Sequence, residues 1–287
     1  MTNSRCRQFQ VRTLLPIFAA VVSVVSSTTA SDLYDVLATG MTDRAESLLT
    51  QSPVLLEAAN DDDMRPLHLA VQQSDIAAVE WLLAHNANVN SLAYNKFTPL
   101  HLCVDGKIAE ALIKAGADLS LADAWGNTSL LHAAAEGNED VVNAILASGC
   151  KLDLRTAIIL KKRDVVSQLL RDEPSLAKQS TEAIDLTHCN TPLGLACSQK
   201  DKEIAELLLT CGADVNETTF LPNCGCNVSA LTNAVWAGDE DVVKLLLKHG
   251  ATTDVAGGKR YPAILDYARR HSTSRIASLL ECAGRSK

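Results

Sequence analysis

Aromatic side chains are scarce in this chain. Phe, Trp and Tyr together make up only 4% of the residues, although hydrophobic residues make up 47%. A core with so few rings has to be built from Leu, Ala and Val, which suits short helices stacked on one another. Glycine and proline recur at fixed places and form no low-complexity run, so the sequence does not predict a long disordered tail. The composition therefore favours an ordered, helical protein.

Positive charge is also in short supply. The formal net charge is −8. Residues 1–30 hold three arginines and no acid, so removing them leaves the rest of the chain at −11. An acidic body without a basic stripe repels the phosphate backbone of nucleic acids. We therefore expect no nucleic acid among the partners of this protein.

No set of residues in the sequence resembles an active site. Gly257-Gly258-Lys259 lacks the spacing of a phosphate-binding loop, and no serine stands in a Gly-x-Ser-x-Gly context. His68 and His101 fall at a recurring structural position, and His85 and His249 end helices, where a cation is favoured by the helix dipole. The sequence predicts a non-enzymatic protein with no cofactor. An enzyme with an unrecognised site is the least supported alternative, because no nucleophile, base or metal set is assembled.

The first thirty residues differ from the rest of the chain. Three arginines precede an apolar run at residues 14–25, and small polar residues follow up to Ala30. This order is typical of a secretory signal peptide, and the run is shorter than the roughly 20 residues that span a membrane. We expect cleavage after Ala30, no stable membrane span, and a secreted or lumenal/periplasmic location. The alternative is an intracellular, cytoplasmic protein that keeps this leader.

A short motif recurs along the remaining chain. In Thr98-Pro99-Leu100-His101, the threonine suits a helix N-cap and the proline suits the first helical position. The leucine begins an apolar stripe, and His101 could hydrogen-bond the turn of the neighbouring unit. Most related blocks are followed by a Leu-rich run and then by Gly-Ala-Asp or a close variant. These blocks begin at Arg65, Thr128, Thr191, Ser229 and Tyr261, and the variants include Gly116-Ala117-Asp118, Gly212-Ala213-Asp214 and Gly250-Ala251-Thr252.

This pattern resembles the ankyrin repeat family, whose units of about 33 residues open with such a motif. The resemblance covers roughly residues 32–283. It implies an all-α fold, an ankyrin-repeat solenoid of stacked helix-turn-helix units with protruding hairpin loops and a concave face that binds proteins. We expect an N-terminal capping repeat at residues 31–63, a repeat array at 64–259 and a C-terminal capping repeat at 260–287.

Three places depart from the repeat. The second full unit is three residues short, and we expect the loss near Asp105-Gly106, between its helices, where it would tighten the corner. The unit at residues 150–190 is divergent. Its first helix is expected at Lys151–Leu160, with the preceding hairpin nearly missing, and it should form the weakest junction of the array. The loop between residues 212 and 229 carries five extra residues.

The chain has nine cysteines, of which eight would remain after removal of the leader. Cys103, Cys197, Cys211 and Cys282 stand at or beside helical positions. A free cysteine at such a position packs as a small apolar residue. We expect these four to be structural.

Loop cysteines allow other chemistry. His188 and Cys189 fall in one hairpin, and Cys224 and Cys226 fall in the next, where adjacent hairpins should be about 10 Å apart. One alternative is a disulfide from Cys189 to Cys224 or Cys226, which an oxidising compartment would favour. Another is a Cys₃His zinc site, against which the Cys-x-Cys spacing counts. The third is a set of exposed thiols. We predict no metal.

The resemblance implies that a partner protein binds at the hairpin tips and the exposed face of the first helices. Tyr and Trp are enriched at binding hot spots, so aromatics projected onto that surface of an aromatic-poor chain are informative. Phe97 is expected to be half-buried beside a helix start. We predict a monomeric protein-interaction scaffold. The expected partner-binding residues are Tyr94, Lys96, Phe97, Trp125, Phe220, Leu221 and Trp236.

Overall fold

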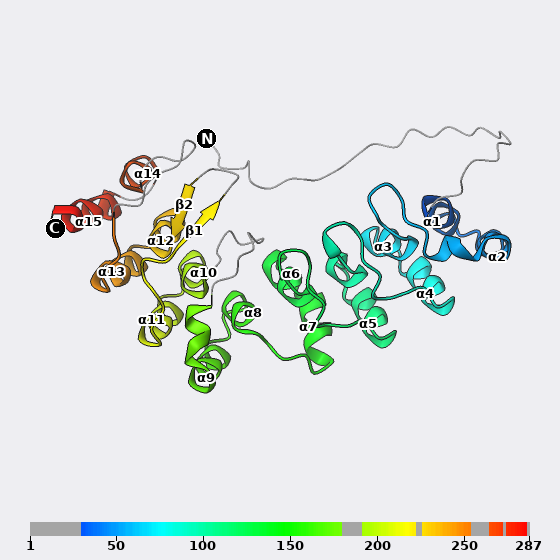
Figure 1. The fold of residues 1–287 in the computed structure, drawn as a ribbon, viewed down its shortest axis with the longest axis horizontal. Coiled ribbons are helices and arrows are strands. Elements are labelled where there is room, and N and C mark those ends of the chain that lie inside the picture. Colours follow the sequence, from blue (N-terminus) through cyan, green and yellow to red (C-terminus); the bar gives the residue numbers. More distant parts are fainter. Residues whose placement is uncertain (1–29, 180–190, 222–225, 254–263, 272–273, 286–287) are drawn as a thin grey trace.

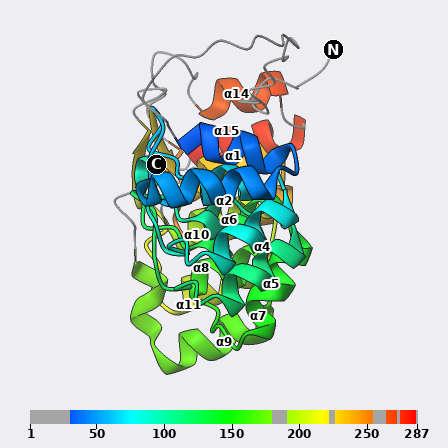
Figure 2. The same ribbon diagram turned by 90° about the vertical axis from the view of Figure 1, so that its right-hand side faces the viewer.

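A computed structural model of the chain describes residues 30–179, 191–221, 226–253, 264–271 and 274–285. Helix pairs follow one another along a curved row, from α1 (Ala30–Ala38) to α15 (Ser274–Arg285) (Figure 1). The first helices of the pairs lie on the inner side of the curve and most second helices lie on the outer side. In Figure 2, which looks along the row, the connecting loops gather on one side of the helices. The predicted stacked, predominantly helical arrangement is confirmed.

The N-terminal part of the row contains four helix pairs. Short 3-10 turns, η1 (Pro53–Leu56) and η2 (Tyr94–Lys96), lie in the connections between them. The pairs are α1 with α2 (Thr42–Gln51), α3 (Pro66–Gln72) with α4 (Ile76–Ala84), the 3-10 turn η3 (Pro99–Leu102) with α5 (Gly106–Lys114), and α6 (Ser129–Glu136) with α7 (Glu139–Ala147).

The C-terminal part continues the same alternation. A 3-10 turn, η4 (Pro174–Lys178), follows its first pair. The pairs are α8 (Leu154–Ile159) with α9 (Arg163–Asp172), α10 (Pro192–Ser198) with α11 (Lys202–Thr210), α12 (Ala230–Ala237) with α13 (Glu240–Lys248), and α14 (Ile264–His271) with α15.

The long loop before α12 contains two antiparallel strands, β1 (Thr218–Leu221) and β2 (Cys226–Ser229). Their register pairs Thr218 with Ser229 at the base and Leu221 with Cys226 toward the tip. The five extra residues of this loop therefore lengthen a hairpin that the helix pairs carry on their loop side. The structure adds this two-stranded sheet to the expected helices.

The recurring histidine joins one unit to the next. The ring Nδ1 of His101 accepts from the backbone N–H of Thr98 at 3.2 Å and contacts the Thr98 hydroxyl at 2.8 Å. Its Nε2 then carries the hydrogen and donates to the carbonyl of Asn127, 3.0 Å away in the following turn. His68 makes the same contact with the carbonyl of Phe97, at 3.0 Å. The predicted bond from His101 to the neighbouring turn is confirmed.

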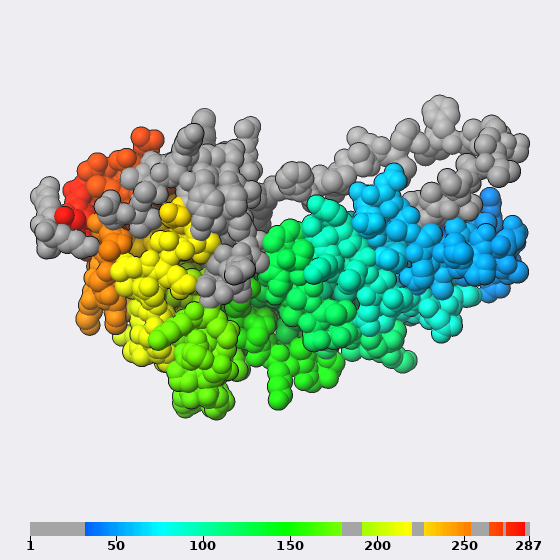
Figure 3. Space-filling model, in the orientation of Figure 1, coloured from blue at the N-terminus to red at the C-terminus, as the bar shows by residue number. Residues whose placement is uncertain are grey.

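Packing is local along the row, because the main contacts of each described pair are with the pairs beside it. The exposed acids of the first cap, Asp32, Asp35, Asp43 and Glu46, face solvent at one end. Arg269, Arg270 and Arg275 are exposed at the other end. Figure 3 shows the result as one continuous arched body. This is how helix pairs too small to bury their own apolar faces become stable together.

The buried side chains of the described residues form two clusters instead of one. The N-terminal core runs from Leu33 to Ile145, and the C-terminal core runs from Leu154 to Leu280. Leu152 and Ile159 are half-buried and pack against both. The division falls in the divergent unit, where α6 contacts α8 but α7 and α9 are not packed side by side.

Two expectations about the irregular units need correction. The three-residue loss shortens the first helix of its unit to the single turn η3, and Asp105 then caps α5 by accepting from the N–H of Lys107 and Ile108 at 2.8 and 3.1 Å. The expected tight corner at Asp105-Gly106 is therefore wrong. The helix expected at Lys151–Leu160 begins later, at Leu154, because Asp153 is its N-cap.

Candidate functional site

A hollow of about 450 Å³ lies on the loop side of the N-terminal units. Three parts of the chain line it: the turn before α3, the tip at η2, and the ends of α3 and η3. α3 continues to Gln72, whereas η3 ends one turn earlier in register, at Leu102. The missing turn leaves room between them. The lining residues of this loop-side hollow are Asp61, Asp62, Met64, Gln72, Ala93, Tyr94, Phe97 and Leu102.

The acidic side of the loop-side hollow is held by Asn60. Its side-chain oxygen accepts from the N–H of Asp62 at 3.0 Å and of Met64 at 2.9 Å. Its backbone N–H donates to the carbonyl of Met64 at 2.9 Å and closes the turn. Asp61, Asp62 and Asp63 are consequently exposed together. This turn is therefore exposed and acidic.

The opposite side of the hollow is the tip at η2. The N–H of Ala93 donates to the carbonyl of Phe97 at 2.8 Å, which closes the tip. Asn95 and Lys96 have left-handed backbones, with φ of 58° and 61°. The carbonyl of Asn95 accepts from the N–H of Ala124 at 2.8 Å, so this tip is tied to the next one. A backbone held in this way presents its side chains in one arrangement.

Phe97 continues from the hollow into a cluster of rings. Its ring centroid lies 5.9 Å from that of Trp125 and 5.3 Å from that of His132, edge to face. Beneath this cluster the buried carboxylate of Asp123 accepts from His132 Nε2 at 2.8 Å. It also accepts from the backbone N–H of Trp125 and of Asn127, both at 2.8 Å. These hydrogen bonds to Asp123 hold the tip that carries Trp125.

Burial and hydrogen bonding set the charges in this cluster. Burial lowers the pKa of His101, although its bond to the Asn127 carbonyl opposes that shift. Burial raises the pKa of Asp123, but the hydrogen bonds from His132 and Asn127 lower it by more, so the net pKa lies below its ordinary value. A carboxylate that accepts several hydrogen bonds stays ionised. The cluster is a structural support, and the open hollow beside it is the feature able to receive a ligand.

The predicted partner-binding residues divide into groups. Tyr94 is 67% exposed, Lys96 is also exposed, and Phe97 and Trp125 are half-buried beside them. The half-buried position expected for Phe97 is confirmed. Trp236 lies in the C-terminal half, where its ring packs edge to face on Tyr267 with centroids 6.2 Å apart. Phe220 and Leu221 belong to β1, and their side chains lie outside the description.

The cysteines fall into two groups as well. Cys103 and Cys197 are buried as expected, and Cys211 is half-buried. Cys282 is exposed, so the expectation that it packs in the core is wrong. Cys189 and Cys224 lie outside the described residues, as does His188, and of Cys226 only the backbone in β2 is described. The disulfide and zinc alternatives therefore stay predictions.

The described residues also bear on two other kinds of site, metal centres and membrane spans. No group of three or more His, Cys, Asp or Glu side chains among them is arranged to hold a metal ion. Across the same ranges, every helix is too short or too polar to cross a membrane. The described lining of the loop-side hollow holds apolar, amide and carboxylate groups.

Several residues of the hollow were not predicted. Asp61, Asp62 and Met64 precede the opening at Arg65, just as Tyr94 and Phe97 precede the opening at Thr98. Equivalent positions in successive repeats lie side by side. The repeat alignment could therefore have predicted that these residues lie close to Tyr94 and Phe97. The contribution of Gln72 and Leu102 depends on where the shortened helix ends, which the repeat pattern alone does not show.

Comparisons with known proteins agree on the architecture. A family model described as ankyrin repeats (3 copies) matches residues 34–123, 67–156 and 154–257. The human transient receptor potential cation channel subfamily A member 1 is 26% identical over 200 residues, which is 64% of this chain and 18% of that protein. The ankyrin repeat protein nuc-2 of Neurospora crassa is 37% identical over 106 residues, which is 35% of this chain and 10% of that protein.

A solved structure is similar as well. The crystal structure of the human ASB11 ankyrin repeat domain is 26% identical and has a TM-score of 0.45, covering 77% of this chain and 98% of that one. By contrast, the matches to the channel subunit and to nuc-2 span less than a fifth of the length of either protein.

Proposed function

The chain belongs to the ankyrin repeat family, and from that premise we propose that it is a non-enzymatic protein-interaction scaffold whose loop-side hollow binds a segment of another protein. The observation that carries this proposal is the position of Tyr94. It is 67% exposed in a chain with only four tyrosines, and it lines a hollow with an apolar floor.

The hollow combines the two components of a specific interface. Met64, Phe97 and Leu102 offer apolar surface, and Asp61 and Asp62 place two carboxylates at its edge. Burying an apolar side chain against such a floor supplies affinity, while charge at the rim favours a partner of opposite sign. The geometry supports a partner segment with an apolar anchor and nearby lysine or arginine.

The proposal is tested by capture followed by measured binding. The mature protein serves as bait in both cell extract and culture medium, and affinity for the captured partner is then measured by calorimetry. Tyr94→Ala should weaken binding by about 2 kcal/mol or more if it is an anchor. Asp61→Asn with Asp62→Asn should lower the association rate and its dependence on salt.

A matched control uses acids away from the hollow. Asp43→Asn with Glu46→Gln makes the same charge change on exposed positions of the first cap and should leave binding unaltered. Equal affinity of wild type, Tyr94→Ala and the Asp61/Asp62 variant would contradict this site. Trp125→Ala and Phe220→Ala test whether the surface extends to the next tip and to β1. Normal binding by both would show that the wider binding face predicted from the sequence is wrong.

The proposed location is outside the cytoplasm, after removal of residues 1–30. Ala30 is the first residue of α1, so cleavage there would leave Ser31 to begin the helix, and serine is a favoured N-cap. Sequencing of exported material should begin at Ser31. A protein retained in cells with Met1 attached would instead support the intracellular adaptor. The mass of the exported protein before and after reduction would show whether Cys189 is bonded to Cys224 or Cys226.

The proposed form in solution is a monomer. Light scattering should give a single species with the mass of one chain. A stable dimer would contradict this, and the surface available for a partner would then have to be reconsidered.

A further inference from the structure

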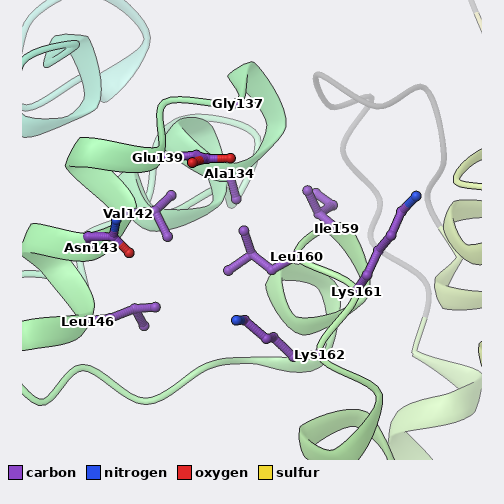
Figure 4. A pocket seen from close by; sticks show the side chains of 10 residues that line it. All are labelled: Ala134, Gly137, Glu139, Val142, Asn143, Leu146, Ile159, Leu160, Lys161 and Lys162. Atoms are coloured by element: carbon purple, nitrogen blue, oxygen red, sulfur yellow. The ribbon is translucent and has the colours of Figure 1, made fainter.

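A second hollow, also of about 450 Å³, lies where the two cores meet. One wall is α7 with the corner before it, and the other wall is the end of α8 with the corner after it (Figure 4). The side chains of Val142, Leu146 and Leu160 give it apolar walls, and Lys162 extends across it toward α7. We call it the junction hollow, lined by Ala134, Gly137, Glu139, Val142, Asn143, Leu146, Ile159, Leu160, Lys161 and Lys162.

The junction hollow occupies a place that a helix fills elsewhere in the row. α4 packs on α5, α5 on α7, α9 on α11, α11 on α13 and α13 on α15, but α7 and α9 are not packed side by side. Among the described elements, the face of α7 that would meet the next second helix instead borders the junction hollow, with Val142 buried and Leu146 half-buried. Its side chains explain the apolar wall, since Val142 and Leu146 stand one turn apart on that helix.

The charged residues that line this hollow are two lysines, Lys161 and Lys162, and one acid, Glu139. The whole chain has a net charge of −8. Arg163 is paired with Asp201, at 3.1 Å, and with Glu203. Lys161 and Lys162 are exposed and form no ion pair with the residues that the structure describes. Glu139 is the one acid of the lining, so positive charge prevails at the rim.

We propose that the junction hollow binds an acidic amphipathic helix of a partner protein, which takes the place of the missing second-helix neighbour. The helix would insert leucine or isoleucine side chains between Leu146 and Leu160. Its acidic residues would face Lys161 and Lys162. Binding of an amphipathic helix in an apolar groove uses anchors spaced three and four residues apart, and opposite charge at the rim gives orientation and specificity. This inference does not rest on the loop-side hollow.

The test is a selection with a defined probe. A displayed library of helical peptides, randomised on one face, is selected on the full chain and counter-selected on an Asn143→Trp variant. Asn143 is exposed and lines the hollow, so tryptophan there fills the space without entering the core. We expect enrichment of peptides with leucine or isoleucine at helical spacing and with flanking aspartate or glutamate.

The affinity of a selected peptide is then compared between wild type and charge variants. Lys161→Glu with Lys162→Glu should weaken binding about tenfold or more, because like charges then face each other across the interface. Lys202→Glu with Lys248→Glu, the same change at exposed positions of α11 and α13, should have no such effect. Circular dichroism and thermal melting of each variant confirm that the fold is retained.

Three results would overturn the inference. The first is a selection that yields only basic or uncharged peptides, or none that distinguishes wild type from Asn143→Trp. The second is an acidic peptide whose affinity is the same for the Lys161/Lys162 variant and the Lys202/Lys248 control. The third is a wild-type dimer that Asn143→Trp converts to monomer, since a second copy of the chain would then be the occupant.

Discussion

At the scale of single residues, the histidine of the repeat opening is the clearest link between sequence and structure. His68 and His101 each accept a backbone N–H on Nδ1, from Arg65 and Thr98, and donate from Nε2 to a carbonyl of the next unit. The Nδ1 bond requires a neutral ring, because a protonated Nδ1 cannot accept, whereas the Nε2 bond to the next unit only needs the ring to donate. Burial lowers the pKa of His68 to about 4. Protonation of this buried ring is therefore coupled to unfolding of the protein.

The pH dependence follows from that shift. Between the ordinary pKa of 6.5 and about 4, the unfolded chain takes up a proton at His68 that the folded chain does not. The free energy of unfolding should therefore fall as pH is lowered through this window, by up to roughly 3 kcal/mol from this residue. Urea unfolding at neutral pH and near pH 4 measures it. His68→Gln should be less stable than wild type at neutral pH, and the difference should shrink in acid.

Exposure of individual side chains was predicted with mixed success. The position of Tyr94 outside the helices and the half-buried state of Phe97 followed from where each stands relative to the helix start. Asn127 is buried, because it is hydrogen-bonded to Asp123 in the turn before α6. Cys282 is exposed although it follows two leucines. Such outcomes depend on the neighbouring unit, which the local pattern does not contain.

At the scale of elements, the repeat pattern predicted the order of helices but not every boundary. The helix expected from Lys151 begins at Leu154, since Asp153 accepts from the N–H and hydroxyl of Thr156 at 2.8 and 2.7 Å. Asp153 could have been identified in the sequence as the N-cap, because it stands three residues before Thr156. The helix start was placed earlier because it was taken from the apolar periodicity alone. The loop before α12 was identified as long, but its strand pairing depends on contacts across the tip.

This cap gives an element-scale prediction. Asp153→Ala should lower the free energy of unfolding by about 1 kcal/mol, because the N–H of Thr156 loses its partner at the start of α8. Asp153→Ser, which keeps an acceptor at the N-cap, should cost less. Hydrogen exchange should quicken mainly in α8 for the alanine variant. Equal losses for alanine and serine would show that Asp153 stabilises the fold by its charge and not by capping.

At the scale of the whole molecule, the buried side chains that the structure describes form two clusters along the single row of repeats. The N-terminal core ends at Ile145 and the C-terminal core begins at Leu154. Leu152 and Ile159 connect them, beside the junction hollow. The sequence already predicted a weak junction from the missing hairpin. The open space between α7 and α8 was not predictable from the sequence. It depends on the distance between α7 and α9, which the short α8 determines.

Two cores with a weak connection should unfold in two steps, since stability in a repeat array is a sum of units and interfaces. Leu82 and Leu208 are both fully buried, one in each core. Replacing either by alanine should lower the stability of its own core by about 2–5 kcal/mol. Hydrogen exchange measured segment by segment should then show faster opening on the altered side of the junction and little change on the other. If both variants accelerated exchange equally along the row, or shifted one common unfolding transition, the junction would have to transmit stability as well as any regular interface, and the division into two bodies would be wrong.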